Sequence, residues 1–304
     1  MRPRIEITQE AGPVKRILVG IDGSAASRDA LRWAARLAHA ADSEVTAVHA
    51  FTPGTSELSP DYAEVLRSAA ERRVEGWCAA AVGPGSVDRL VIDGGPDALL
   101  ATAAEQADLL VVGTRGPGSL AHVHLGSVVH HLAHHTLVPL AIVPTSAAVH
   151  PVKRIVVGVD GSAGSAAAVA FCARLARLLT AAVVAVYADE PIVEWAAESD
   201  PCSWPPYAEA EVRRWVAPIE DSGVPVAVDV EWDVPAVATL CRAIEAAPDT
   251  LAIVGTRSLG DISGLRLSRV PIQLVHHTGA AVVMVPQDTR LSAAASGSEG
   301  LRAP

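Results

Sequence analysis

A group of small residues in the first half of the chain has the composition of an anion-binding loop. Gly113 and Gly116 are followed, after nine intervening residues, by Gly126 and Ser127. Glycines let the backbone approach an anion closely, and the free N–H groups and positive dipole end of a helix N-terminus attract phosphate. The chain has neither a Gly-Lys-Ser/Thr Walker A loop nor a GxGxxG fingerprint. Spacing alone therefore leaves two interpretations open, a phosphate cradle and an ordinary surface loop.

A carboxylate stands at the start of the same half. Asp22 follows the apolar segment RILVGI (16–21) and precedes Gly23-Ser24, a turn and helix-start signal. It could contact a bound anion's remaining groups or serve only as a hydrogen-bond acceptor in the turn. The sequence shows no Ser nucleophile with a clear His base and no Cys–His pair. Since Asp22 is the evident carboxylate near the glycine loop, any phosphoryl transfer is expected to be slow.

The loop and the segment after it contain six histidines, His122, His124, His130, His131, His134 and His135. Residues four apart share a helix face, so 130/134 and 131/135 form two candidate metal-binding pairs. No carboxylate or cysteine accompanies them at ligand spacing, and we therefore expect no metal site. The first two lie within the nine-residue stretch, where phosphate contact and a solvated loop both remain possible.

The chain contains one sequence pattern twice. VKRILVGIDGSAAS (14–27) returns as VKRIVVGVDGSAGS (152–165), and HHTLVPLAIVP (134–144) returns as HHTGAAVVMVP (276–286). The offset grows from 138 to 142, which indicates an insertion of four residues in the second copy. Each copy is near 140 residues, a common domain size. We expect domains at 1–148 and 149–288 and a disordered tail at 289–304.

Each copy alternates apolar segments with segments of helical periodicity. In the first copy we expect strands at 16–21, 44–51, 88–92, 108–114 and 139–144, with helices between them. This alternation predicts a parallel sheet with helices on both faces. A ligand then binds beyond the carboxyl ends of the strands, at the topological switch point. In the second copy, the prolines of DPCSWPPY (200–207) are expected to interrupt the second helix with a loop.

Composition excludes several classes of protein. Half of the residues are apolar, which is ample for burial, and the net charge of −10 without a Lys/Arg cluster disfavours nucleic acid as a partner. The four cysteines lack metal spacing and disulfide density, which favours a reducing compartment. The first residues lack a signal peptide's apolar region, and no apolar run is long enough for a membrane span. A cytoplasmic protein is expected.

These motifs together make the chain resemble a tandem protein of the universal stress protein (UspA) family, over essentially all of residues 14–286. The nucleotide motif of the family, G-x2-G-x9-G-(S/T), is matched by Gly113, Gly116, Gly126 and Ser127. The resemblance implies two Rossmann-like, HUP-type α/β domains. Each is expected to contain a five-stranded parallel sheet in the order 3-2-1-4-5, with helices on both faces.

The resemblance also implies that the first copy binds ATP. Asp22 would contact the nucleotide from the end of the first strand, and Ala50 would contact adenine through its backbone, with Ile21 and Val128 beside them. Magnesium would arrive with the phosphates. The implied function is a nucleotide-responsive stress regulator. The alternatives are a slow ATPase or a nucleotidyl- or phosphotransfer enzyme, and a stress scaffold that binds an unidentified protein partner and no nucleotide.

The second copy departs from the motif. The corresponding residues of a weaker second site are Asp160, Gly255, Ser258 and Ser268. Ser258 and Ser268 place side chains where the first copy has glycines, and Arg269 replaces Ser127. Two interpretations remain open: a rebuilt site in which Arg269 pairs with phosphate, and a blocked site in which it pairs with Asp160 or Asp261. Reduced or absent binding is the expectation. Arg115 and Arg257 recur in both copies, which favours a structural role.

Assembly is the last expectation from the resemblance. Domains of the family typically pair through their last strands, here 139–144 and 280–286. Both are apolar and would otherwise form exposed sheet edges. We therefore expect the two copies to pack against each other within the chain as a pseudo-twofold unit, and two chains to form a homodimer.

Overall fold

The computed structural model describes residues 14–52, 60–116, 125–148, 150–189, 204–257 and 269–289. Its elements alternate as expected. The first copy contains β1 (Arg16–Gly20), α1 (Ala25–Ala41), β2 (Glu44–Phe51), α2 (Pro60–Val82), β3 (Asp88–Asp93), α3 (Pro96–Ala104), β4 (Leu109–Gly113), α4 (Ser127–His135) and β5 (Leu140–Val143).

A short 3-10 helix, η1 (Thr145–Ala148), leads toward the second copy. That copy contains β6 (Arg154–Gly158), α5 (Ala163–Leu179), β7 (Ala182–Asp189), α6 (Trp204–Asp221), β8 (Val226–Trp232), α7 (Ala236–Glu245), β9 (Thr250–Gly255), α8 (Arg269–His277) and β10 (Ala281–Val285).

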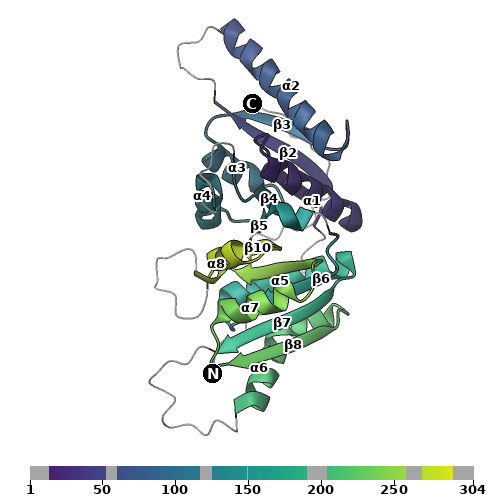
Figure 1. Ribbon diagram of the computed structural model, residues 1–304, viewed down its shortest axis with the longest axis vertical. Helices are drawn as coiled ribbons and strands as arrows, with labels where there is room; N and C mark the ends of the chain where they lie inside the picture. The colour runs from purple at the N-terminus through teal and green to yellow at the C-terminus, as the bar shows by residue number, and fades with distance from the viewer. Residues whose placement is uncertain are drawn as a thin grey trace.

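All described strands join one ten-stranded sheet in the order β3-β2-β1-β4-β5-β10-β9-β6-β7-β8. Each copy contributes five parallel strands in the order 3-2-1-4-5, as the resemblance implied. Figure 1 shows the first copy in the upper half and the second in the lower half, with β5 and β10 adjacent at the centre. The switch point of each copy lies where the order turns, between its first and fourth strands.

The strands are nearly continuous apolar segments because both faces of the sheet are covered. Alternate residues point to opposite faces, so β1 sends Ile17 and Val19 to one core and Leu18 to the other. Helices α1, α2, α5 and α6 cover the first face, while α3, α4, α7 and α8 cover the second. Each core contains residues of both copies, so the apolar interior continues across the whole sheet.

The two copies meet through an antiparallel pair of strands, β5 and β10. Ala141 lies opposite Val283, flanked by the pairs Leu140–Met284 and Ile142–Val282, and every one of these side chains is fully buried. Because Ala141 and Val283 occupy equivalent positions of the repeat, the pseudo-twofold axis passes between them. The last strands, named above as apolar edges, therefore form the contact between the copies.

One expectation about the second copy is wrong in its described part. Helix α6 begins at Trp204, so Pro205 and Pro206 lie in its first turn instead of in an interrupting loop. The first turn of a helix tolerates proline because its N–H groups have no intrahelical acceptor. The start of DPCSWPPY, residues 200–203, and the tail from residue 290 lie outside the described residues. Within the described ranges, no helix is long and apolar enough to cross a membrane.

Candidate functional site

The turn after β1 is held by backbone geometry and by an aromatic ring. The N–H of Ile21 donates to the carbonyl of Val48 at 2.8 Å, which extends the pairing with β2 beyond the end of β1. Gly23 then adopts a φ of +81°, which L residues rarely adopt. A Cβ there would lie 2.4 Å from the ring of Trp77 on α2. Glycine is therefore required where the chain reverses into α1.

Asp22 takes part in this turn and also faces the glycine loop. Its Oδ1 accepts a hydrogen bond from the N–H of Ser24 at 2.9 Å. Ser24 is the N-cap of α1, and its Oγ accepts from the N–H of Ser27 at 3.1 Å. The second carboxylate oxygen, Oδ2, lies 2.7 Å from the place where a Cβ of Gly116 would be. The turn role is thus observed, and it leaves Oδ2 beside the loop.

Gly116 and Gly126 lie side by side although they are ten positions apart. The N–H of Gly126 donates to the carbonyl of Thr114 at 3.1 Å, which draws the start of α4 to the end of β4. A Cβ on Gly126 would be 3.9 Å from the backbone nitrogen of Gly116. Asp22, Gly116 and Gly126 therefore form one continuous surface at the carboxyl edge of the sheet. The intervening residues 117–124, with His122 and His124, lie outside the described residues.

Gly113, the first glycine of the motif, has a different reason to be glycine. A Cβ there would lie 2.6 Å from the backbone carbon of Ala26, on the first turn of α1. Gly255 in the second copy has the same relation to Gly164, at 2.4 Å. Since the contact recurs in both copies, it is explained by close packing of a strand end against a helix. Gly113 therefore does not need a ligand to account for it.

Gly126 has no such internal explanation. Its backbone is extended, with φ −73° and ψ 158°, so conformation does not require glycine. The nearest atoms to an added Cβ are at 3.9 Å, which is ordinary contact distance. It is the N-cap of α4 and offers no side chain to cap the helix. The next two residues, Ser127 and Val128, are respectively exposed and half-buried. Among the described residues, the start of α4 therefore combines N–H groups that no side chain caps with open space.

The remaining predicted residues lie at the same edge with unequal access. Ile21 is only 3% exposed and packs in the core under α1. Ala50 lies near the end of β2, opposite Ile92 of β3, and is half-buried. Each residue reaches this edge because it lies at the end of a strand, Ile21 just after β1 and Ala50 near the end of β2.

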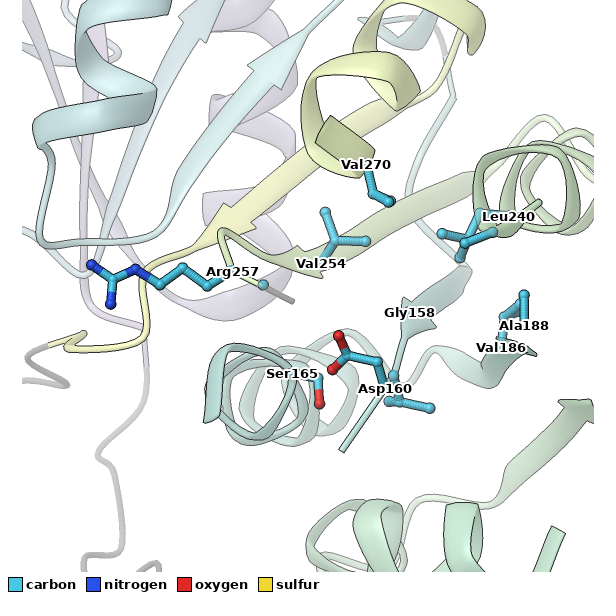
Figure 2. A pocket seen from close by; sticks show the side chains of 12 residues that line it. Gly158, Asp160, Ser165, Val186, Ala188, Leu240, Val254, Arg257 and Val270 are labelled. Atoms are coloured by element: carbon cyan, nitrogen blue, oxygen red, sulfur yellow. The ribbon is translucent and has the colours of Figure 1, made fainter. Parts of the chain in front are cut away.

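The second copy has a pocket of about 80 Å³ at the equivalent edge. Apolar side chains of β7, α7, β9 and α8 form most of its wall, and Asp160 and Ser165 add polar groups. Figure 2 shows the carboxylate of Asp160 pointing into the pocket, while the side chain of Arg257 points away from it. Gly255 lines the pocket at the end of β9. Ser258 and Ser268 lie outside the described residues.

The recurrent arginines act through their backbones. The hydroxyl of Ser24 donates to the carbonyl of Arg115 at 3.3 Å, and that of Ser162 donates to the carbonyl of Arg257 at 3.2 Å. Each bond joins the loop after the fourth strand of a copy to the N-cap of its first helix. Arg269 is exposed at the start of α8, and no ion pair among the described residues joins it to Asp160. Asp261 lies outside the described residues.

Sequence reasoning missed an aromatic support behind each turn. In the first copy, Nδ1 of His49 lies 2.8 Å from the carbonyl oxygen of Ile21, and its ring meets Trp77 edge-on at 5.2 Å. In the second copy, Tyr187 and Trp215 take these positions, with ring centroids 5.6 Å apart. The repeat offset of 138 relates His49 to Tyr187 and Trp77 to Trp215, so the sequence repeat marks both positions as aromatic. It could not show that the two rings touch.

The histidines of α4 form two pairs of tilted rings and no metal cluster within the described ranges. Ring centroids are 4.7 Å apart for His130 and His134 and 4.2 Å apart for His131 and His135. No group of three possible ligands occurs among the described residues. Burial, followed by repulsion from its three histidine neighbours, lowers the pKa of His134. Nδ1 of His131 lies 3.9 Å from Oδ2 of Asp97 on α3.

Fold and site together define a class: two doubly wound α/β domains in tandem, each with a candidate ligand site beyond the carboxyl ends of its strands. The family model described as the universal stress protein family matches residues 13–144 and 151–286. The chain belongs to this family, with two copies of its domain.

Relatives agree with the assignment. Universal stress protein Rv2623 of Mycobacterium tuberculosis is 30% identical over 276 residues, which cover 84% of this chain and 90% of that protein. Universal stress protein Rv1996 of the same organism is 27% identical over 317 residues, covering 91% and 97%. The crystal structure of a universal stress protein from Archaeoglobus fulgidus superposes with a TM-score of 0.65 at 16% identity, covering 90% of this chain and 99% of that one. The last likeness supports the fold.

Proposed function

We propose that the first copy binds ATP, with magnesium carried by the phosphates, and that the protein is a nucleotide-responsive stress regulator. Family membership supports a site of this kind, but the observation that carries the proposal is Gly126. Neither its backbone conformation nor its neighbours require glycine, and it opens the N-terminus of α4 to the carboxyl edge of the sheet. A glycine that the fold does not need, at a helix N-terminus, favours close approach of a phosphate.

The neighbouring residues would complete the site. Gly116 allows the loop to lie against the carboxylate of Asp22, so the phosphates and the remainder of the nucleotide would share one surface. The exposed hydroxyl of Ser127 would add a donor at the start of α4. Ala50 is the repeat equivalent of Ala188, which lines the pocket of the second copy. Ala50 would therefore form part of the wall of the first site. Nothing in this set is a clear base or a charged clamp for phosphoryl transfer, which supports binding over rapid turnover.

Gly126→Val tests the proposal. A Cβ there meets only ordinary contacts among the described residues, so the variant is expected to fold, with the modest loss of stability that valine causes at an N-cap. It would occupy the place of the phosphates and should weaken ATP binding, measured by calorimetry, at least tenfold. Gly76→Ala is the matched control, because a Cβ at Gly76 on α2 meets nothing within 4 Å. Normal ATP affinity in folded Gly126→Val would refute this placement.

Stoichiometry separates the two copies. In the second copy, Ser258 and Ser268 replace glycines of the motif and Arg269 replaces its serine. We therefore expect one tight ATP per chain, bound by residues 14–144. Calorimetry with two equivalent sites would show that the second pocket is a rebuilt site. A turnover assay on the same samples distinguishes the regulator from a slow ATPase, and the absence of any ATP binding would favour the scaffold.

A further inference from the structure

A second polar site lies far from the glycine loop, at the junction of the two copies. A cavity of about 40 Å³ opens between α1, the segment that leads into β6, and the end of α5. Trp33 and Leu37 of α1, Val152 of the junction and Leu179 of α5 form apolar walls. Arg36 contributes its guanidinium group to the lining, and the exposed His150 lies at the same cavity.

The guanidinium of Arg36 has two buried donors without acceptors. Its Nε and Nη2 are buried, and neither has a hydrogen-bond partner within the described structure. These two nitrogens form one edge of the planar group, which binds two oxygens of a carboxylate or oxyanion in parallel. Burying such donors without acceptors is unfavourable. An occupant with two acceptor oxygens would satisfy both.

The second copy has an ion pair at the same position. Arg174 of α5 is the repeat equivalent of Arg36, and its Nη2 lies 3.8 Å from Oδ1 of Asp108, which belongs to the first copy. Strand register places Asp108, just before β4, and Thr250, the first residue of β9, at equivalent positions. The pseudo-twofold axis therefore relates the Arg174–Asp108 pair to Arg36 and Thr250. Arg36 has the neutral side chain of Thr250 at the position where Arg174 has the carboxylate of Asp108. The hydroxyl of Thr250 donates instead to the carbonyl of Ala247 at 2.7 Å.

We propose that the cavity at Arg36 binds a small oxyanion of the phosphate or sulfate class, held by Nε and Nη2. A cavity water needs about 10–15 Å³, so the space suits a group of several atoms and excludes a nucleotide. No carboxylate lines the cavity within the described residues. The nearby Arg32 is paired with Asp29 at 2.6 Å, so it does not need the anion. The bound ion would link α1 to the second copy.

Inorganic phosphate is the probe, and the full-length chain is tested in a Gly126→Val background. That background removes the phosphate response of the proposed nucleotide site, so the two proposals fail separately. We expect the melting temperature to rise saturably with phosphate in this background. Adding Arg36→Met should abolish the rise, because the fork of donors is lost. Arg177→Met is the control, since Arg177 is an exposed arginine of α5, and it should keep the full response.

A second variant keeps the test decisive if Arg36→Met folds poorly. Thr250→Asp places a carboxylate at the position equivalent to Asp108, and this internal acceptor should replace the ion. The variant should no longer respond to phosphate. A phosphate response that persists unchanged in Arg36→Met, or in Thr250→Asp, would overturn the proposal. So would a background chain that shows no saturable response at all.

Discussion

The glycines of the family motif do three different things in this molecule. Gly113 permits a strand end to pack on α1, Gly116 lies against the carboxylate of Asp22, and Gly126 leaves open space at the start of α4. A motif written as spaced glycines treats these positions alike. Substitution should separate them, because one supports the fold and another supports the ligand.

Gly113→Ala is expected to destabilise the protein. Its Cβ would lie 2.6 Å from backbone carbon of Ala26, so α1 must shift or the strand must bend. Overpacking of this kind typically costs about 1–3 kcal/mol. Urea denaturation should show a lower midpoint than in Gly126→Val. Equal midpoints for the two variants would contradict the assignment of Gly113 to packing.

Asp22→Ala is expected to weaken ATP binding less severely than Gly126→Val. Losing one or two charge-assisted hydrogen bonds typically costs about 1–3 kcal/mol, or about 5–150-fold in Kd. The change also removes the acceptor of the Ser24 N–H, so some stability should be lost as well. Asp160→Ala makes the corresponding change in the second copy and should leave the tight site intact. Calorimetry of both variants decides the point.

Helix α4 connects the candidate site to the paired histidines. It begins at the open glycine and ends with His134 and His135 in its last turn. A cation near a helix C-terminus is favoured by the helix dipole. The pKa of His134 is nevertheless lowered, because burial and the neighbouring histidines outweigh that effect.

The lowered pKa gives stability a defined pH dependence. Because folding lowers the pKa of His134, the unfolded chain binds its proton more readily, and stability rises with pH through this range. The contribution is present above the unfolded pKa, near 6.5, and is lost as the pH falls through the lower folded value. His134→Gln should reduce the loss of melting temperature between pH 7.5 and about 5.5. An identical pH profile in the variant would show that His134 does not contribute.

Sequence patterns predicted the elements well where local chemistry determines them. The expected strand at 44–51 coincides with β2, and Ser24 starts α1 as its N-terminal signal indicated. The predicted loop in DPCSWPPY was wrong at Pro205 and Pro206, because proline at the first turn and proline inside a helix look alike in sequence. The packing role of Gly113 and the cavity at Arg36 depend on neighbours distant in the chain, so no local pattern shows them.

The ten-stranded sheet makes the two copies one structural unit. Both cores continue through the seam, and Ile142 and Val283 are fully buried there. An ion pair adds a further link, since Arg174 of the second copy approaches Asp108 of the first. We therefore expect one cooperative unfolding transition for the whole chain.

Ile142→Asp should break this unit. A carboxylate at this fully buried seam position would be removed from water, with no cation among the described seam residues to pair with it. The free energy of unfolding should therefore fall by roughly 3–5 kcal/mol. Two transitions in calorimetry and an expanded profile in solution scattering are the expected results. Val65→Asp is the control, because Val65 on α2 is 58% exposed. Unchanged stability and compactness in Ile142→Asp would show that the seam does not hold the copies together.

The antiparallel seam also has a consequence for biosynthesis. Strand β5 ends at Val143, but its partner β10 begins at Ala281, nearly the whole second copy later. At about 5–20 residues per second, the ribosome needs roughly 7–28 s to make that stretch. During this interval the first copy can fold while its apolar edge has no intramolecular partner. Nascent chains on the same mRNA are then most exposed to pairing with each other through the free edge of β5. This exposure ends when β10 has been synthesised and pairs with β5.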